Sequence, residues 1–271
     1  VSLQQLGMPA SLLRHYLGLI NQPHGMILIT GPTGSGKTTT LYATLEKINN
    51  EKQKIITVED PVEYQLDGIT QIQANSSIGL NFATGLRSIV RQDPDVLMVG
   101  EIRDHETAEI AIESALTGHL VFSTLHTNDA AGAVTRLQDM GVEGYLISSS
   151  LLAIQAQRLV RRICPDCAQQ HELSDDEATV LEIEKAFCPH ITRGSGCDLC
   201  GNTGYRGRVG LYELLLMSDA IRHHIASGAD ANIIREQAIE EGMTTLRQDA
   251  LEKLRAGMTT PEEVVRVTRA L

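Results

Sequence analysis

The chain has 271 residues, of which 42% are hydrophobic and 21% are charged, and this composition excludes a disordered or low-complexity protein. A formal net charge of −11 and an aromatic content of 3% disfavour a surface that binds phosphate backbones or stacks on bases, so we expect no nucleic-acid partner. No apolar run reaches the roughly 18 residues of a membrane span, and the N-terminus shows no secretory signal pattern. Because the sequence begins at Val1 rather than at Met, we expect it to be a piece of a longer protein.

The predicted secondary structure alternates between buried strands and helices, after a helical stripe of apolar residues over 3–20. Because the strands are apolar on both faces, we expect a parallel α/β sheet that is covered by helices on both sides. The expected strands are 25–30, 55–58, 69–72, 96–99 and 120–123, and the expected helices are 37–48, 82–90 and 106–116.

The composition changes near Arg158, where basic residues, cysteines and then an acidic stretch replace the alternating pattern. We therefore expect an α/β nucleotide-binding core over 1–157, a cysteine-bearing insertion over 158–205 and a mainly helical part over 206–271. In that last part, Gly228, Gly242 and Gly257 each follow an expected helix, and Pro261 is expected to open the final one.

Gly31–Thr38 fits the phosphate-binding pattern GxxxxGK[ST], and it lies between an expected strand and an expected helix, as that loop requires. The glycines allow backbone N–H groups to surround phosphate, and the helix N-terminus adds a positive dipole. Lys37 is expected to reach the β- and γ-phosphates and Thr38 to ligate Mg²⁺. The residues expected to contact the nucleotide are Gly31, Thr33, Gly34, Ser35, Gly36, Lys37, Thr38 and Thr39.

Hydrolysis of a nucleotide needs carboxylates beside this loop, one on the Mg²⁺ side and one to orient the attacking water. Glu101 follows a buried strand, where open α/β sheets place their chemistry, although it is also placed to cap the next helix. Glu59, Asp60 and Glu63 surround a turn after another strand. One of these three is expected to act on water, and the alternative is a solvated acidic turn.

Two histidines, His119 and His126, bracket the strand expected over 120–123. His126 lies beyond the carboxyl end of this strand, where an imidazole is able to sense the γ-phosphate or relay a proton. The alternative for either histidine is a structural residue with its hydrogen bonds satisfied.

Four of the five cysteines form two CxxC pairs, Cys164–Cys167 and Cys197–Cys200. Four thiolates suit a tetrahedral, structural Zn²⁺ with no open coordination position. The spacer over 168–196 is longer than in usual zinc ribbons, and a redox pair is the alternative. Cys188 fits neither pair, and we expect it to be a partly buried free thiol.

Taken together, these segments resemble the secretion ATPases of type II secretion and type IV pilus assembly, over essentially the whole chain. Gly31–Thr40 is similar to the Walker A motif of that family, and Thr57–Tyr64 to its acidic "Asp box". Asp93–Asp104 resembles its Walker B motif, which ends in Glu, and Thr117–Asn128 resembles its "His box". The two CxxC pairs are similar to the tetracysteine motif of the assembly ATPases, which favours assembly or secretion over pilus retraction.

The resemblance implies a RecA-like P-loop NTPase with ATP, Mg²⁺ and Zn²⁺ as cofactors. It implies an ATP-hydrolysing motor that forms a homo-hexameric ring and acts with platform proteins at the cytoplasmic face of the inner membrane, peripheral to the bilayer. It makes Glu63 the catalytic carboxylate, Glu101 the acid on the Mg²⁺ side, and His126 with His119 the sensors of the γ-phosphate.

Nothing in the sequence matches the N-terminal domain through which this family supplies arginines to the nucleotide. Arg87 and Arg91 are therefore the candidates for phosphate or intersubunit contacts. Two other functions remain open at this point. One is a RecA-like nucleic-acid motor, which the acidic charge disfavours, and the other is a nucleotide-gated binding module with a zinc lobe as its interaction platform.

Overall fold

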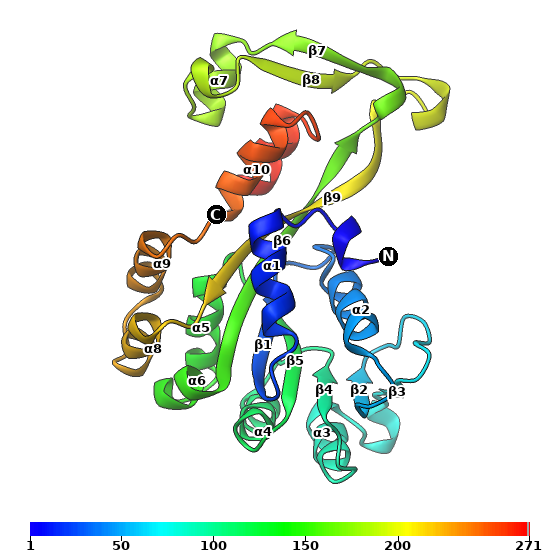
Figure 1. Cartoon of the computed structure of the whole chain (residues 1–271), viewed down its shortest axis with the longest axis vertical. Helices are drawn as coiled ribbons and strands as arrows, with labels where there is room; N and C mark the ends of the chain where they lie inside the picture. The colour runs from blue at the N-terminus through cyan, green and yellow to red at the C-terminus, as the bar shows by residue number, and fades with distance from the viewer. Residues whose placement is uncertain (270) are drawn as a thin grey trace.

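The computed structural model describes residues 1–269 and 271 and shows an α/β fold around one central sheet (Figure 1). Within these residues the sheet has seven strands in the order β3-β2-β4-β5-β1-β6-β9. All neighbouring strands are parallel except β6 and β9, which are antiparallel. The strands are β1 (Gly25–Thr30), β2 (Ile55–Glu59), β3 (Thr70–Gln73), β4 (Val96–Val99), β5 (Leu120–Leu125), β6 (Leu151–Ile163) and β9 (Tyr205–Leu216).

Helices cover both faces of the sheet, as the strand pattern predicts. Strand β1 shows why, because Ile27 and Ile29 face one apolar cluster while Met26 and Leu28 face another. The first cluster includes α1 (Ala10–Leu19) and α2 (Lys37–Ile48). The second includes α3 (Phe82–Val90), α4 (His105–Leu116), α5 (Ala130–Asp139) and α6 (Gly144–Ser150).

The strands and helices of the core follow the local pattern closely. The structure has β1, α2, α3 and β4 at the predicted residues, while β5 continues two residues further, to Leu125. The expected helical stripe over 3–20 is interrupted. Only Leu3–Gln5 forms a short 3₁₀ helix before α1, because Gly7 adopts a left-handed φ of 93° and Pro9 lies directly before the first residue of α1.

The C-terminal part differs from the expectation of a mainly helical segment over 206–271, because it begins with the long strand β9. This strand pairs with β6, whose own residues run from 151 to 163 across the expected boundary at 157. Residues 209–215 of β9 are buried consecutively. This run, in which Glu213 is the one charged residue, shows no clear period that separates strand from helix, so the long-range pairing with β6 decides its conformation.

The antiparallel strands β6 and β9 form a ladder that leads away from the core to a small distal lobe (Figure 1). The lobe contains the hairpin of β7 (Ala168–Glu172) and β8 (His190–Gly194) with helix α7 (Asp175–Leu181) between its strands. The remaining 3₁₀ helices are Ser76–Ile78, Pro165–Cys167, Lys185–Phe187 and Asp198–Cys200. The long spacer between the CxxC pairs is therefore a folded unit.

In the part of the chain that the structure describes, four helices follow β9, and the predicted glycines end three of them. Gly228, Gly242 and Gly257 have φ of 79°, 101° and 73°, and Pro261 is the first residue of the last helix. No helix within the described residues is both long and apolar enough to cross a membrane. The four helices are α8 (Asp219–Ala226), α9 (Ala231–Glu240), α10 (Leu246–Arg255) and α11 (Pro261–Thr268).

A buried carboxylate attaches the last helix to the ladder. Glu263, whose side chain is 1% exposed, accepts hydrogen bonds from the backbone N–H of Arg161 at 2.6 Å and from its Nε at 3.1 Å. Arg266 donates to the same carboxylate at 2.8 Å. Burial alone raises the pKa of Glu263, but the donors from Arg266 and Arg161 outweigh it and lower the pKa from 4.5 to about 2.

We therefore expect Glu263→Gln to lower the free energy of unfolding by about 1–3 kcal/mol near neutral pH, because Arg161 and Arg266 lose an ionised acceptor. Since the pKa of Glu263 is depressed in the folded state, its contribution is complete above pH 4.5 and is lost as the pH falls towards about 2. Denaturant unfolding at a series of pH values measures the difference between the variant and the native protein. This difference in the free energy of unfolding should become smaller as the pH falls. The control Glu252→Gln, which breaks an exposed pair with Arg255, should change the free energy of unfolding by less than about 0.5 kcal/mol at every pH.

Candidate active site and metal centre

Four loops meet at one edge of the sheet because β2, β4, β5 and β1 are parallel neighbours. The P-loop follows β1, the acidic turn follows β2, Glu101 follows β4 and His126 follows β5. The residues that the sequence places after separate strands thus come together in space, as expected for the carboxyl edge of an open α/β sheet.

The conformation of the P-loop depends on its glycines. Gly34 and Gly36 have φ of 81° and 87°, a left-handed region that other residues rarely adopt, and Gly36 is the N-cap of helix α2. At Gly31, an added Cβ would lie 2.5 Å from the carbonyl oxygen of Gln157. The loop conformation therefore depends on glycines that allow a left-handed turn and a close approach to the backbone of Gln157. This conformation leaves the N–H groups at the start of α2 available for an anion.

Lys37 lies at the centre of the loop. Its Nζ donates to the carbonyl oxygens of Gly31 at 2.7 Å and Pro32 at 3.0 Å, and it is 3.4 Å from Nδ1 of His126. Burial lowers the pKa of Lys37, more than the nearby Glu101 raises it. A half-buried ammonium group with two carbonyl partners is well suited to accept anionic phosphate oxygens.

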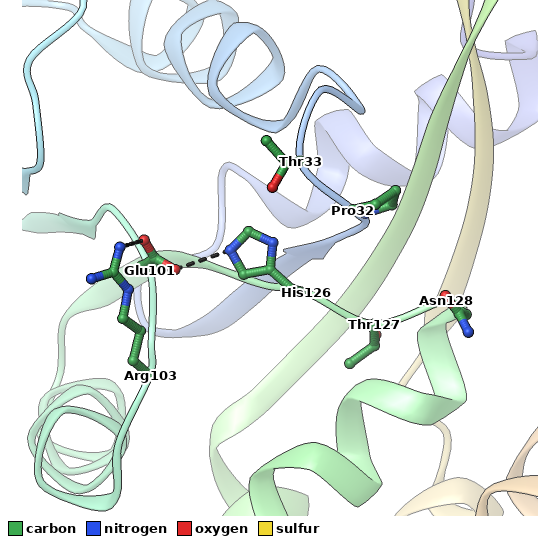
Figure 2. Close-up of a pocket in the computed structure, with 7 residues that line it drawn as sticks. All are labelled: Pro32, Thr33, Glu101, Arg103, His126, Thr127 and Asn128. Carbon is green, nitrogen blue, oxygen red and sulfur yellow. Dashed lines mark hydrogen bonds and ion pairs between the residues drawn. The ribbon is translucent and has the colours of Figure 1, made fainter.

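Glu101 and His126 face each other beside the P-loop (Figure 2). Nε2 of His126 is 3.0 Å from Oε2 of Glu101, and Arg103 hydrogen-bonds the other carboxylate oxygen. Burial raises the pKa of Glu101, but the hydrogen bonds from Arg103 and His126 outweigh this effect and keep the pKa below its usual value. Glu101 is therefore an anion at neutral pH, as a residue on the Mg²⁺ side of a nucleotide would need to be.

The alternative interpretation of Glu101, as the cap of the next helix, does not match the structure. Asp104 caps helix α4, since its Oδ1 accepts the backbone N–H of Thr107 at 2.8 Å, whereas Glu101 lines the cavities beside the P-loop. The sequence reasoning missed Arg103, which lines the outer of these cavities with Pro32 and Thr33. Its only signal in the sequence is its position two residues after Glu101.

The three acids of the turn after β2 have different surroundings. Glu59 is 4% exposed, and it accepts hydrogen bonds from Tyr42, from Thr57 at 2.6 Å and from Gln71 at 3.2 Å. It is a satisfied structural carboxylate. Asp60 and Glu63 are exposed and line a cavity of about 190 Å³. Thr33, Lys37, Thr38, Glu101 and His126 line the same cavity.

Not every predicted contact residue reaches this cavity. Ser35 is buried, and its Oγ has no hydrogen-bond partner within the described residues. Thr39 is exposed and lies outside both cavities at the P-loop. Arg87 pairs with Glu106 across α3 and α4, and Arg91 is exposed; neither lines these cavities.

The expectation that His119 acts with His126 is wrong for the site within this chain. His119 precedes β5, while His126 follows it, so the two imidazoles lie at opposite edges of the sheet. The six residues of β5 separate these two edges of the sheet by roughly 20 Å. Nδ1 of His119 lies 2.9 Å from the carbonyl oxygen of Ser114, which makes it a satisfied structural residue at the end of α4.

The two CxxC pairs converge where the β6–β9 ladder meets the distal hairpin. Their four sulfur atoms all lie within 4.8 Å of one another. The Cys164–Cys197, Cys167–Cys200 and Cys197–Cys200 sulfurs are 3.8, 3.9 and 3.7 Å apart. A tetrahedron of Zn–S bonds of about 2.3 Å places its sulfurs about 3.8 Å apart, whereas a disulfide needs about 2.05 Å.

Backbone N–H groups support negative charge on these sulfurs. Cys197 and Gly204 each donate to Sγ of Cys200 at 3.3 Å, and Gly196 donates to Sγ of Cys167 at 3.3 Å. Burial raises the pKa of the Cys200 thiol, but the N–H groups of Cys197 and Gly204 outweigh it and lower the pKa to about 6, whereas burial raises the pKa of the Cys167 thiol to about 11 and also raises that of Cys197. The donor set and its geometry therefore fit a Zn²⁺ ion.

Cys188 does not belong to this cluster. It is fully buried, its Sγ donates to the carbonyl oxygen of His190 at 3.2 Å, and burial raises the pKa of its thiol. It is a free thiol, as the sequence predicts, but it is fully rather than partly buried.

Comparison with known proteins places this arrangement in a family. The family model described as type II/IV secretion system protein matches residues 1–266. The chain belongs to this family. It is 51% identical over 269 residues to type II secretion system protein E of Aeromonas hydrophila. This match covers 99% of this chain and 54% of that protein. The corresponding ATPase E of Vibrio cholerae is 52% identical over 269 residues, with 99% of this chain and 53% of that protein covered. The chain thus spans about half the length of the curated relatives that it matches.

Solved structures of other proteins share the fold over the whole chain. The pilus retraction motor PilT with bound ADP has a TM-score of 0.72 and 31% identity, covering 100% of this chain and 68% of that one. The ATPase DotB of Legionella pneumophila has a TM-score of 0.73 and 24% identity, covering 100% of this chain and 66% of that one, and it supports the fold alone. The parallel sheet with its P-loop is therefore the RecA-like ATPase architecture that the sequence predicts.

Proposed function

We propose that this chain is the ATP-hydrolysing motor domain of a secretion ATPase that powers assembly of a type II secretion pseudopilus or a type IV pilus. The observation that supports this most directly is the convergence of Lys37, Glu63, Glu101 and His126 on one P-loop cavity. The chain belongs to the type II/IV secretion family and is 52% identical to an ATPase of that family. A nucleotide-driven motor best explains why it carries these four groups around one cavity.

In this proposal ATP lies with its phosphates over the N-terminus of α2. Lys37 exchanges its carbonyl partners for oxygens of the β- and γ-phosphates, and His126 contacts the γ-phosphate. Thr38 and Glu101 hold Mg²⁺, which neutralises charge on the phosphates. Glu63, the exposed acid of the cavity, orients the attacking water, while buried Glu59 keeps the turn in place.

The whole protein is proposed to act as a homo-hexamer peripheral to the cytoplasmic face of the inner membrane, bound there through platform proteins. The similarity to type II secretion proteins supports this assignment. Light scattering of the full-length protein tests the ring directly, and a monomer in the presence of ATP and Mg²⁺ would argue against it.

We further propose that Cys164, Cys167, Cys197 and Cys200 hold a structural Zn²⁺. The sulfur separations and the N–H donors support this, and four thiolates leave no open coordination position for catalysis. The ion would join the distal hairpin to the end of the ladder, since one CxxC pair lies between β6 and β7 and the other lies between β8 and β9.

Lys37→Ala should weaken binding of ATP by at least about tenfold, because the phosphates lose a charge-assisted hydrogen bond from a half-buried cation. Calorimetric titration with ATP and Mg²⁺ measures the affinity. Lys47→Ala removes an exposed lysine from the other end of the same helix and should leave the affinity unchanged. Equal affinities for Lys37→Ala and the native protein would refute the P-loop assignment.

Glu63→Gln and Glu101→Gln should each bind ATP yet hydrolyse it about 10²-fold or more slowly in the assembled protein, since each keeps its shape and loses the charge that acts on water or Mg²⁺. Phosphate release under saturating ATP gives the rate. Glu113→Gln, an exposed change on α4, serves as the control and should keep the native rate. A native rate in either site variant would mean that its role is wrongly assigned.

Protein purified without chelator should contain about one Zn²⁺ per chain. Cys164→Ser should lose the metal and expose residues 158–210 to proteolysis, while the P-loop keeps its affinity for ATP. Cys188→Ser, which removes a thiol outside the cluster, should keep the metal. Metal-free protein with a Cys164–Cys167 disulfide would instead favour the redox interpretation.

A further inference from the structure

Strand β6 passes beside both of the loops that surround the proposed γ-phosphate position. It pairs in parallel with β1, and Thr30, the last residue of β1, lies opposite Ala156. Gln157 and Arg158 therefore continue along the P-loop, where β1 has already ended. Because consecutive residues of a strand point to opposite faces, their side chains meet different segments.

Gln157 contacts the P-loop from the face that carries α2. Its side chain is buried, Nε2 donates to the carbonyl oxygen of Ser35 at 2.9 Å, and Oε1 accepts from Oγ1 of Thr40 at 3.0 Å. The same residue's backbone carbonyl lies against Gly31. One glutamine thus holds the beginning and the end of the phosphate-binding loop.

Arg158 contacts the segment after β5 from the opposite face. Its Nη2 donates to the carbonyl oxygen of Asn128 at 3.0 Å and lies 3.4 Å from Oδ1 of the same residue. Asn128 follows His126 by two residues and stands at the start of α5, beside the long strand β6 (Figure 2). The Thr30 hydroxyl also holds Thr127, since its Oγ1 accepts the backbone N–H of Thr127 at 3.0 Å and lies 2.6 Å from Oγ1 of the same residue.

Arg158 is only 7% exposed, and its Nε has no hydrogen-bond partner within the described residues. Asp129 and Glu213 attract its charge, and burial nevertheless lowers its pKa. Glu213 in turn accepts the first N–H groups of α5 and α10, from Ala130 and Leu246, at 3.0 Å each. A buried guanidinium that is incompletely bonded is a poor source of stability, so its contact with Asn128 suggests a role in placing that segment.

We propose that Gln157 and Arg158 are positioning residues that set the P-loop and the His126 segment at a fixed spacing, one from each face of β6. This spacing is measured by the distance of 3.4 Å between Nζ of Lys37, in the P-loop, and Nδ1 of His126. Neither residue of β6 lines the cavities at the P-loop, so neither touches the nucleotide. The inference rests on the proposed function, in which Lys37 and His126 bind the phosphates.

The two residues should have separable effects on nucleotide binding. Both ADP and ATP bind the P-loop, whereas only ATP presents a γ-phosphate to His126. Loss of the Gln157 contacts should therefore weaken both nucleotides, while loss of the Arg158 contact should remove part of the preference for ATP.

The experiment compares Arg158→Met, Gln157→Leu and Arg162→Met by calorimetric titration with ADP and with the non-hydrolysed analogue adenylyl imidodiphosphate, each with Mg²⁺. Arg158→Met should keep its ADP affinity within about twofold and bind the analogue about tenfold more weakly, as expected for one charged hydrogen bond. Gln157→Leu should weaken both. Arg162→Met, the same change at an exposed position of the same strand, should alter neither.

Retained ADP binding shows that the Arg158→Met site is folded, and Arg158→Lys, which keeps the charge, should recover part of the analogue affinity. An equal loss for both nucleotides, or no loss for the analogue, in Arg158→Met and Arg158→Lys would overturn the role of Arg158. Lys37→Ala, titrated alongside, separates the two hypotheses. If it lowers ATP affinity while Arg158→Met does nothing, only the present inference fails; if Lys37→Ala has no effect, the proposed function fails with it.

Discussion

Strand β1 hydrogen-bonds to two parallel neighbours, β5 on one side and β6 on the other, and the arrangement of the site depends on this pairing. Parallel strands in register end at the same edge, so the chain leaves β1 as the P-loop directly between the His126 segment and the continuing part of β6. The pairing of β4 with β5 extends the same edge to Glu101, and that of β2 with β4 extends it to the acidic turn. Each loop is free to carry polar residues because the strands below it bury apolar residues on both faces.

Buried polar groups then fix the loops relative to one another. Gln157, Arg158 and Glu213 lie on the two strands that the sheet adds beyond β1, and each satisfies backbone groups of a different segment. An unsatisfied backbone group in such a place would cost about 1–3 kcal/mol, so these side chains restrict where the loops and helix ends can lie. Glu213 is the clearest case, because a single carboxylate receives the ends of α5 and α10. The nucleotide site and the C-terminal helices thus share one polar framework.

The distal lobe follows a different principle. It is joined to the core through the β6–β9 ladder (Figure 1), and its sulfur cluster lies just past the end of β6, whereas the P-loop lies beside Gln157 in the middle of that strand. At about 3.3 Å per residue, the seven residues from Gln157, which contacts the P-loop, to Cys164 span roughly 23 Å. At the junction between the ladder and the hairpin, the backbones of Gly194 and Gly204 approach each other closely, since a Cβ on Gly194 would lie 2.1 Å from the carbonyl oxygen of Gly204. A metal in this lobe would therefore affect local order, with little direct influence on phosphate binding.

Features that depend on neighbouring residues could be predicted from the sequence: β1, α2, α3 and β4, the loop Gly31–Thr38, and the places of Glu101 and His126 after their strands. Local periodicity and glycine placement carry that information. The tertiary structure decided whatever depends on a distant partner. It made residues 205–216 a strand through pairing with β6, and it separated buried Glu59 from exposed Glu63 through Tyr42 and Gln71. It also removed His119 from the site and brought Arg103, Gln157 and Arg158 to it, because burial and hydrogen bonding between segments far apart in the chain leave no local pattern.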